Sequence, residues 1–303
     1  MKPVLLFSVM AILFGCTQSP VETSHSSAPK VDSPPAETNY DGPAVARALT
    51  ARYQNTARDC GSTSHPAFLC SGVVMRVTSN SHNYHAWNPS PSSVISGGVS
   101  FSYLRIDSTF LGVHNNFGNG FVFYPLMETP SAKHSVEVLC AFPINALTDE
   151  RAEQGCGAYP TYPTESQRCS AIGITTAEQW FNHFATVGAF NPAHQCGFDV
   201  RVQTGSLAAD SFYQNLRARN MLPPVLFQIT TELRLALWPQ DIHSTVPIEA
   251  FFYTSRAGLA GAQYDQFDLY RAGGVRVPII KLTLPTLTQP ARFEFIASDQ
   301  SVD

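Results

Sequence analysis

Apolar and polar residues alternate along several short segments in the first half of the chain, which is the pattern of β-strands. The clearest example covers residues 98–105, where Val99, Phe101 and Tyr103 alternate with Ser100 and Ser102. This alternation predicts a strand with one buried and one solvated face. Further strands are predicted at residues 72–77, 120–124 and 135–140.

Apolar residues spaced four apart predict helices elsewhere. One is expected from Asp41 to about Arg58, with Pro43 in its first turn. Another is expected to begin at Thr175, which would form a capping box with Glu178. Further helices are predicted at 207–219, 231–238 and 259–271, with strands at 246–253 and 275–284. This order indicates an α+β domain over residues 42–303, with a mixed, mainly antiparallel sheet and packed helices.

The N-terminus has the layout of an export signal. Residues 1–15 combine a charged start, a short apolar core and a small residue at the end, and Cys16 follows directly. This layout resembles the lipobox of bacterial lipoproteins, in which the signal is cut before a cysteine that then carries acyl chains. The apolar run is too short to span a bilayer. We therefore expect an exported protein anchored to the outer membrane through Cys16, the alternative being a secreted protein cut elsewhere.

Residues 16–41 are rich in Ser, Pro, Thr and Glu and contain almost no large apolar side chain. Such a segment buries too little surface to order itself, so we expect a lipidated, disordered tether.

The other six cysteines form an even set, which in an exported protein indicates disulfides. Fifteen pairings are open, but loop closure favours neighbours in sequence. We expect disulfide-stabilised loops with the pairs Cys60–Cys70, Cys140–Cys156 and Cys169–Cys196. No pair has CxxC spacing and the nine His residues show no ligand motif, so no metal site is predicted.

Composition narrows the class of partner. Hydrophobic residues make up 44% of the chain and charged residues 14%, with a net charge of −4. No basic stripe is visible, so a nucleic-acid partner is not expected.

Five stretches together resemble the halovibrins, exported bacterial proteins of marine vibrios and pseudomonads: YHAWNPS at 84–90, SGGVSFSYLR at 96–105, TELRLALW at 231–238, PIEAFFY at 247–253 and VPIIKLTLP at 277–285. The resemblance covers about residues 42–299. It implies NAD chemistry, as an NAD-glycohydrolase or an ADP-ribosyltransferase. NAD or a related nucleotide would then be the substrate, with no separate cofactor and with a host or competitor protein as a further target.

Cleavage of the nicotinamide–ribose bond passes through an oxocarbenium-like state, which needs a carboxylate beside the reacting carbon. Glu249 is the first candidate, because it interrupts an apolar predicted strand. The other interpretation places Glu249 on the solvent face of an edge strand, as Pro247 would favour. Glu232 is the second candidate, and its position at a predicted helix start gives it an ordinary structural explanation.

Four further residues are candidates for substrate binding. Arg76 breaks the apolar pattern of an early strand, where many ADP-ribosylating toxins place an NAD-binding arginine, although their Glu-x-Glu motif is missing here. The nearest match, at 263–265, is interpreted as helix surface. His85 and Trp87 lie in a Ser/Asn/Pro-rich loop, and Trp238 could stack on a ring or simply pack in the core.

Two functions therefore compete. The first is an exported enzyme that cleaves NAD. The second is a non-enzymatic outer-membrane lipoprotein that binds a small molecule or a protein partner. A buried Glu249 at the floor of an aromatic-lined cleft would favour the first, and a flat polar surface with no cleft would favour the second.

Overall fold

The computed structural model describes residues 40–78, 99–108, 118–123, 134–146, 156, 168–201, 207–223, 230–239 and 248–301. Residues Ala36 to Asp303 form one compact unit. The predicted signal, Cys16 and most of the predicted tether lie outside the described residues.

The described strands form one sheet in the order β5-β4-β6-β2-β1-β3-β7-β8-β9. The parallel pair is β7–β8, and the other described pairings are antiparallel. The α+β prediction is thereby confirmed. The bounds are β1 Val73–Val77, β2 Val99–Leu104, β3 Asn119–Phe123, β4 His134–Phe142, β5 Phe198–Asp199, β6 Thr231–Pro239, β7 Ile248–Tyr253, β8 Ile279–Thr283 and β9 Arg292–Phe295.

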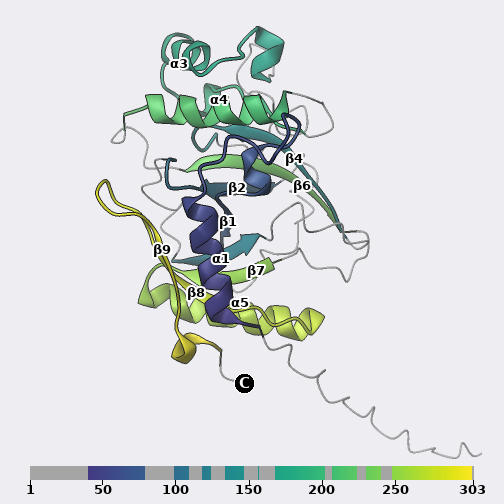
Figure 1. The fold of residues 1–303 in the computed structure, drawn as a ribbon, viewed down its shortest axis with the longest axis vertical. Helices are drawn as coiled ribbons and strands as arrows, with labels where there is room; N and C mark the ends of the chain where they lie inside the picture. The colour runs from purple at the N-terminus through teal and green to yellow at the C-terminus, as the bar shows by residue number, and fades with distance from the viewer. Residues whose placement is uncertain are drawn as a thin grey trace, which may run out of the picture. The chain divides into compact units, whose positions relative to one another are not determined.

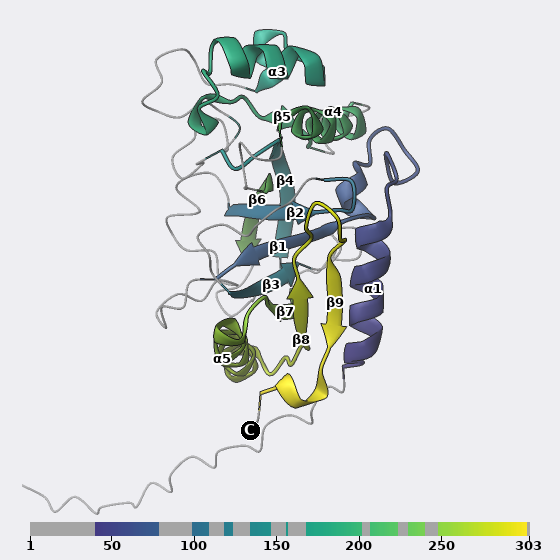
Figure 2. The same ribbon diagram turned by 90° about the vertical axis from the view of Figure 1, so that its left-hand side faces the viewer.

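The described α-helices are α1 (Gly42–Gln54), α3 (Ala177–Thr186), α4 (Ala208–Met221) and α5 (Arg256–Gly273). Helix α5 connects β7 to the parallel strand β8, as such a crossover requires. Figure 2 shows α5 and α1 on opposite sides of this end of the sheet. Figure 1 shows α3 lying on α4, which separates α3 from the sheet.

Local signals start two of these helices close to where the sequence predicts. Asp41 caps α1 by accepting a hydrogen bond from the Ala44 amide over 2.9 Å. Helix α3 begins one residue later than predicted: its capping box joins Thr176 to Gln179. The prediction of Thr175 and Glu178 is wrong because either threonine satisfies the motif, and only the backbone geometry selects one.

Each face of the sheet carries an apolar core. Phe101 and Tyr103 of β2 belong to the larger core, which contains residues of α4 and α5. Met75 and Leu104 belong to a second core beneath α1. From Phe101 to Leu104, strand β2 is therefore buried on both faces, since Ser102 is also only 9% exposed, and Ser100 is the partly exposed residue before them. The expectation of a half-buried strand missed the layer that α1 adds.

The predicted helix at 231–238 is wrong, because these residues form strand β6. Leu, Ala, Glu and Arg favour helices, so the propensity of these residues agrees with a helix. However, Leu233 and Leu235 alternate with Glu232 and Arg234, and pairing with β2 and β4 on both sides makes the strand the stable choice.

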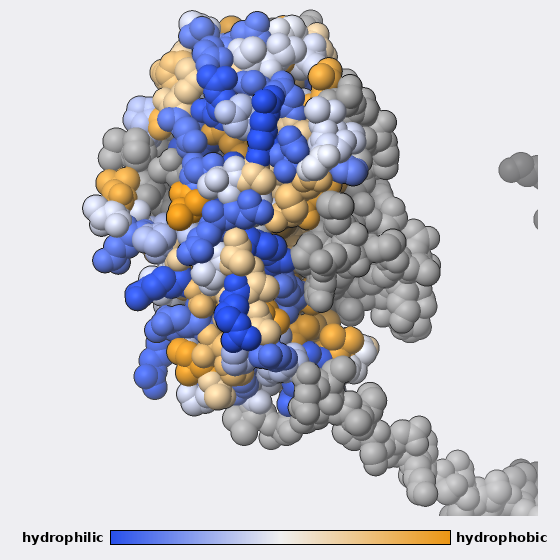
Figure 3. All heavy atoms as spheres, in the orientation of Figure 1, coloured by the Kyte–Doolittle hydropathy of each residue, from blue (hydrophilic) through white to orange (hydrophobic). Residues whose placement is uncertain are grey.

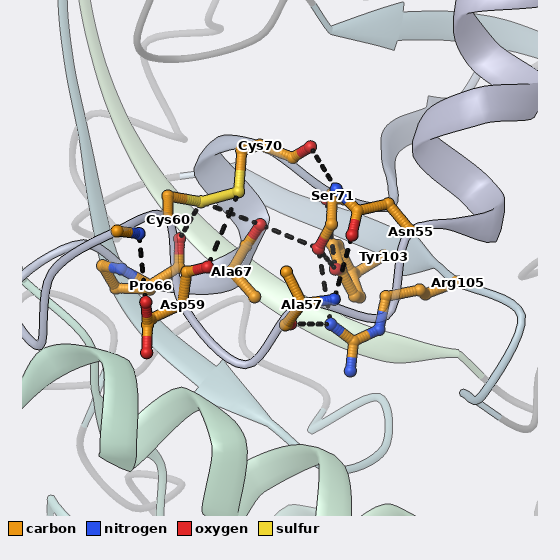
Figure 4. Close-up of a disulfide and its surroundings, with 11 residues drawn as sticks. Asn55, Ala57, Asp59, Cys60, Pro66, Ala67, Cys70, Ser71, Tyr103 and Arg105 are labelled. Carbon is orange, nitrogen blue, oxygen red and sulfur yellow. Dashed lines mark hydrogen bonds between the residues drawn. A yellow bond between two sulfur atoms is a disulfide. The ribbon is translucent and has the colours of Figure 1, made fainter.

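All three predicted disulfides are present: Cys60–Cys70, Cys140–Cys156 and Cys169–Cys196. Figure 4 shows the first, which closes a loop beside the end of β2. There the buried Arg105 donates to the Ala57 carbonyl oxygen over 2.8 Å and to Ser71 Oγ over 3.3 Å. The guanidinium of Arg105, directly after β2, thus binds the segments on both sides of the disulfide loop.

Hydrophilic and hydrophobic residues are interspersed on the face of the molecule shown in Figure 3. Among the residues that the structure describes, no helix has the length and apolar character needed to cross a bilayer.

Candidate functional site

Three polar side chains meet on the two central strands β2 and β6. Ser100 Oγ donates a hydrogen bond to Glu232 Oε1 over 2.7 Å and accepts one from Arg234 Nη1 over 2.9 Å. The Ala146 amide, just beyond β4, donates to Glu232 Oε2 over 2.8 Å. Both carboxylate oxygens are therefore held by donors. We call Ser100, Glu232 and Arg234 the Ser100 cluster.

The register of the sheet explains why these residues meet. Ser100 lies opposite Arg234, and Ser102 lies opposite Glu232. Residues two apart on a strand share a face, so all three members of the cluster project from the same side. Glu232 and Arg234 are 3% and 2% exposed, and Ser100 is half-buried. Withdrawal from water strengthens every electrostatic interaction among them.

Arg76 on β1 borders this cluster. Its Nη1 donates to the backbone oxygen of Ser100 over 2.8 Å. Because side chains alternate along β1, Arg76 projects from the same face of the sheet as Val74. The Ser100 cluster projects from the other face. Ser100 therefore joins the two: its carbonyl oxygen binds Arg76, and its hydroxyl binds Glu232.

Glu249 lies apart from these residues. It occupies an irregularity in the β3–β7 pairing and forms an ion pair with Arg52 of α1. Strand β7 lies between β3 and β8, so the interpretation of Glu249 on an edge strand is wrong. The apolar neighbours pack in the cores, and the carboxylate, with 9% of the side chain exposed, is balanced by the guanidinium.

The other residues that the sequence analysis named do not belong to the Ser100 cluster. His85 and Trp87 lie outside the described residues. Trp238 lies on β6 opposite Ser135, and its side chain is not described. The expectation that Asp265 lies on the helix surface is wrong: it is 7% exposed and accepts hydrogen bonds from Thr78 and Asn119.

Sequence reasoning missed Ser100 and Arg234. A usable signal was present, because both strands alternate polar and apolar residues over the same stretch. Two strands with this pattern, if paired, bring their polar residues onto a common face. Once 231–238 was assigned to a helix, that relationship could not be derived.

A cleft of about 360 Å³ lies elsewhere, between the turn after β2 and the β8–β9 loop. Tyr53, Asp107 and Thr288 are among its lining residues, and the Ser100 cluster is not. Among the described residues, no group of three or more His, Cys, Asp or Glu side chains gathers as metal ligands would.

No protein-family model matches this chain, and no curated protein matches it. The resemblance to the halovibrins therefore rests on the sequence stretches themselves. The Ser100 cluster is seen in the structure itself and does not depend on that resemblance.

Proposed function

We propose that this protein cleaves the nicotinamide–ribose bond of NAD or a related nucleotide, and that Glu232 is the carboxylate beside the reacting carbon. The observation that carries the proposal is the fixed Glu232 carboxylate, bound on one oxygen by Ser100 and on the other by the Ala146 amide. The halovibrin resemblance supplies the substrate class.

In this reaction the bond between ribose C1′ and the nicotinamide nitrogen breaks, and its electron pair leaves with neutral nicotinamide. Positive charge develops on the ribose, which a nearby carboxylate stabilises. A water molecule or a protein nucleophile then forms the new bond at C1′ and releases a proton to solvent. Because the hydrogen bonds already orient Glu232, the carboxylate needs little reorganisation as the charge develops.

The structure favours Glu232 over Glu249 for this role. Glu249 is neutralised by Arg52, and both side chains belong to the junction of α1 with the sheet. Glu232 is adjacent to Ser100, whose carbonyl oxygen binds Arg76. Arg76 contacts the Ser100 backbone from the opposite face of the sheet, so it is not included in the proposed site around Glu232.

We also propose export and lipid anchoring through Cys16, as the N-terminal pattern implies. If the acceptor is a protein, a host or competitor protein is then the second substrate.

The test is nicotinamide release from NAD by the purified exported protein. Glu232→Gln keeps the shape of the side chain and removes its charge. It should lower kcat by roughly 10²–10³-fold with KM little changed, because the charge acts mainly on the transition state. Glu249→Gln is the matched control and should retain the parent kcat while folded. Parent activity in Glu232→Gln, or a parent inactive on NAD, would overturn the proposal.

A binding lipoprotein is the second candidate, and the cleft beside Tyr53 and Asp107 favours it. A volume of about 360 Å³ lies within the usual range of small-molecule pockets. If the parent protein releases no nicotinamide but binds a small molecule, and Thr288→Trp abolishes that binding, the second candidate is supported instead.

A further inference from the structure

We infer that Arg234 is a positioning residue that acts on Glu232 through the hydroxyl of Ser100. This inference rests on the proposed function and assigns a role within the same site. The relevant contacts are Arg234 Nη1 to Ser100 Oγ at 2.9 Å and Ser100 Oγ to Glu232 Oε1 at 2.7 Å.

The direction of these hydrogen bonds follows from the groups themselves. A guanidinium can only donate, and a hydroxyl has one hydrogen to give. Ser100 Oγ accepts from Arg234 and donates its own hydrogen to Glu232. An ionised carboxylate can only accept, so the chain runs in one direction, from Arg234 to Ser100 to Glu232. Hydrogen bonds connected in this way polarise and strengthen one another.

Among the groups around Glu232, Arg234 is the cation that contacts the Ser100 hydroxyl. Around Glu232, β2 contributes the hydroxyls of Ser100 and Ser102, and β4 contributes Phe142 as the pairing partner. On the face that carries Glu232, Arg234 of the same strand contacts the Ser100 hydroxyl, while Arg76 reaches the Ser100 carbonyl oxygen from the other face of the sheet. Arg234 therefore orients the hydroxyl, and Arg76 contacts the backbone.

A purely structural role for Arg234 predicts a different outcome. In that case Arg234 would stabilise the fold as a buried cation, and its loss would lower stability without acting through Ser100. If Arg234 acts through Ser100, removing either residue breaks the same chain of hydrogen bonds. The losses in kcat would then fail to multiply, which a double-mutant cycle measures.

The experiment compares nicotinamide release by the parent exported protein, Ser100→Ala, Arg234→Met and the double variant. Arg234→Met should lower kcat roughly 10-fold to 100-fold with KM within about 3-fold, because only the orientation of Glu232 is lost. The double variant should be no slower than the slower of the two single variants. Arg234→Lys keeps a donor at this position and should recover part of the rate.

Ser102→Ala is the matched control, because this hydroxyl donates to Thr230 Oγ1 over 3.0 Å and not to Glu232. It should retain the parent kcat. Circular dichroism and urea unfolding establish which variants fold, and if Arg234→Met does not, the cycle is run with Arg234→Lys and Ser100→Ala.

Losses that multiply, or a rise in KM alone, would overturn this inference while leaving the proposed function in place. A parent protein that releases no nicotinamide would overturn both.

Discussion

Glu249 on β7 and Arg52 on α1 form an ion pair that joins the first helix to the sheet. The two side chains are 9% and 16% exposed, so the pair is largely withdrawn from water. Removing one partner of such a pair leaves the other charge without compensation. The sequence singled out Glu249 for its charge in an apolar strand, and the structure gives that charge a structural partner.

The first prediction concerns this pair. Glu249→Gln should lower the free energy of unfolding by about 3 kcal/mol, because Arg52 would then be a poorly solvated charge without a carboxylate. Urea unfolding followed by circular dichroism measures the change. Glu294→Gln is the control, since Glu294 pairs with Lys281 across β8 and β9 with nearly half of each side chain exposed. Its effect should stay below about 1 kcal/mol. Equal losses in the free energy of unfolding for the two substitutions would contradict this prediction, because the buried Arg52 pair would then contribute no more than an exposed pair.

The second prediction concerns the disulfides. Replacing Cys60 and Cys70 by Ala should cost roughly 2–4 kcal/mol, because the bond restricts the unfolded chain. The Cys169–Cys196 pair closes a longer loop, with a sequence separation of 27 instead of 10. The chain-entropy model therefore predicts a slightly larger loss for the second pair, by about 1 kcal/mol. Urea unfolding of both double variants tests the order, and a clearly larger loss for Cys60 and Cys70 would contradict it.

The third prediction concerns alkaline pH. Desolvation raises the pKa of the buried Tyr103 hydroxyl from 10.0 to about 12. Between these values the unfolded state loses a proton that the folded state keeps, so this contribution to stability is present below pH 10 and is lost as pH rises to 12. Burial lowers the pKa of Arg219 to about 10, which acts in the opposite direction over the same range.

Because the two effects oppose each other, the difference between the parent and Tyr103→Phe is the informative quantity. Near pH 8 the variant should be less stable by about 1 kcal/mol, since Ser71 loses a partner. From pH 10 to 12 the parent should lose stability relative to the variant by about 1.4 kcal/mol per pH unit. Unfolding at a series of pH values measures this slope, and a constant difference would show that Tyr103 titrates normally.

The fourth prediction concerns localisation. Cys16→Ser removes the thiol that would carry acyl chains and should release the protein from the membrane fraction. Cell fractionation followed by immunoblotting measures the distribution. Cys60→Ala is a control that removes a thiol from the domain and should leave the anchored fraction unchanged. Membrane retention of Cys16→Ser would contradict the lipoprotein interpretation.

The sequence by itself determined the features that depend on neighbouring residues. Short segments rich in apolar residues located β1 to β4, with clear alternation in β2, and the cap at Asp41 located α1. Short loop closures gave the disulfide pairing, because the entropy cost of closing a loop grows with its length. These signals are local, so no knowledge of the rest of the chain was needed.

Tertiary structure decided the features that depend on partners far along the chain. β6 is a strand because β2 and β4 pair with it on both sides, although its residues favour a helix. The same pairing places Glu232 and Arg234 beside Ser100 and so creates the candidate site. Arg52 and Glu249 are likewise brought together by packing of α1 on the sheet. A local pattern shows which residues are polar, but only strand register and helix packing decide which of them meet.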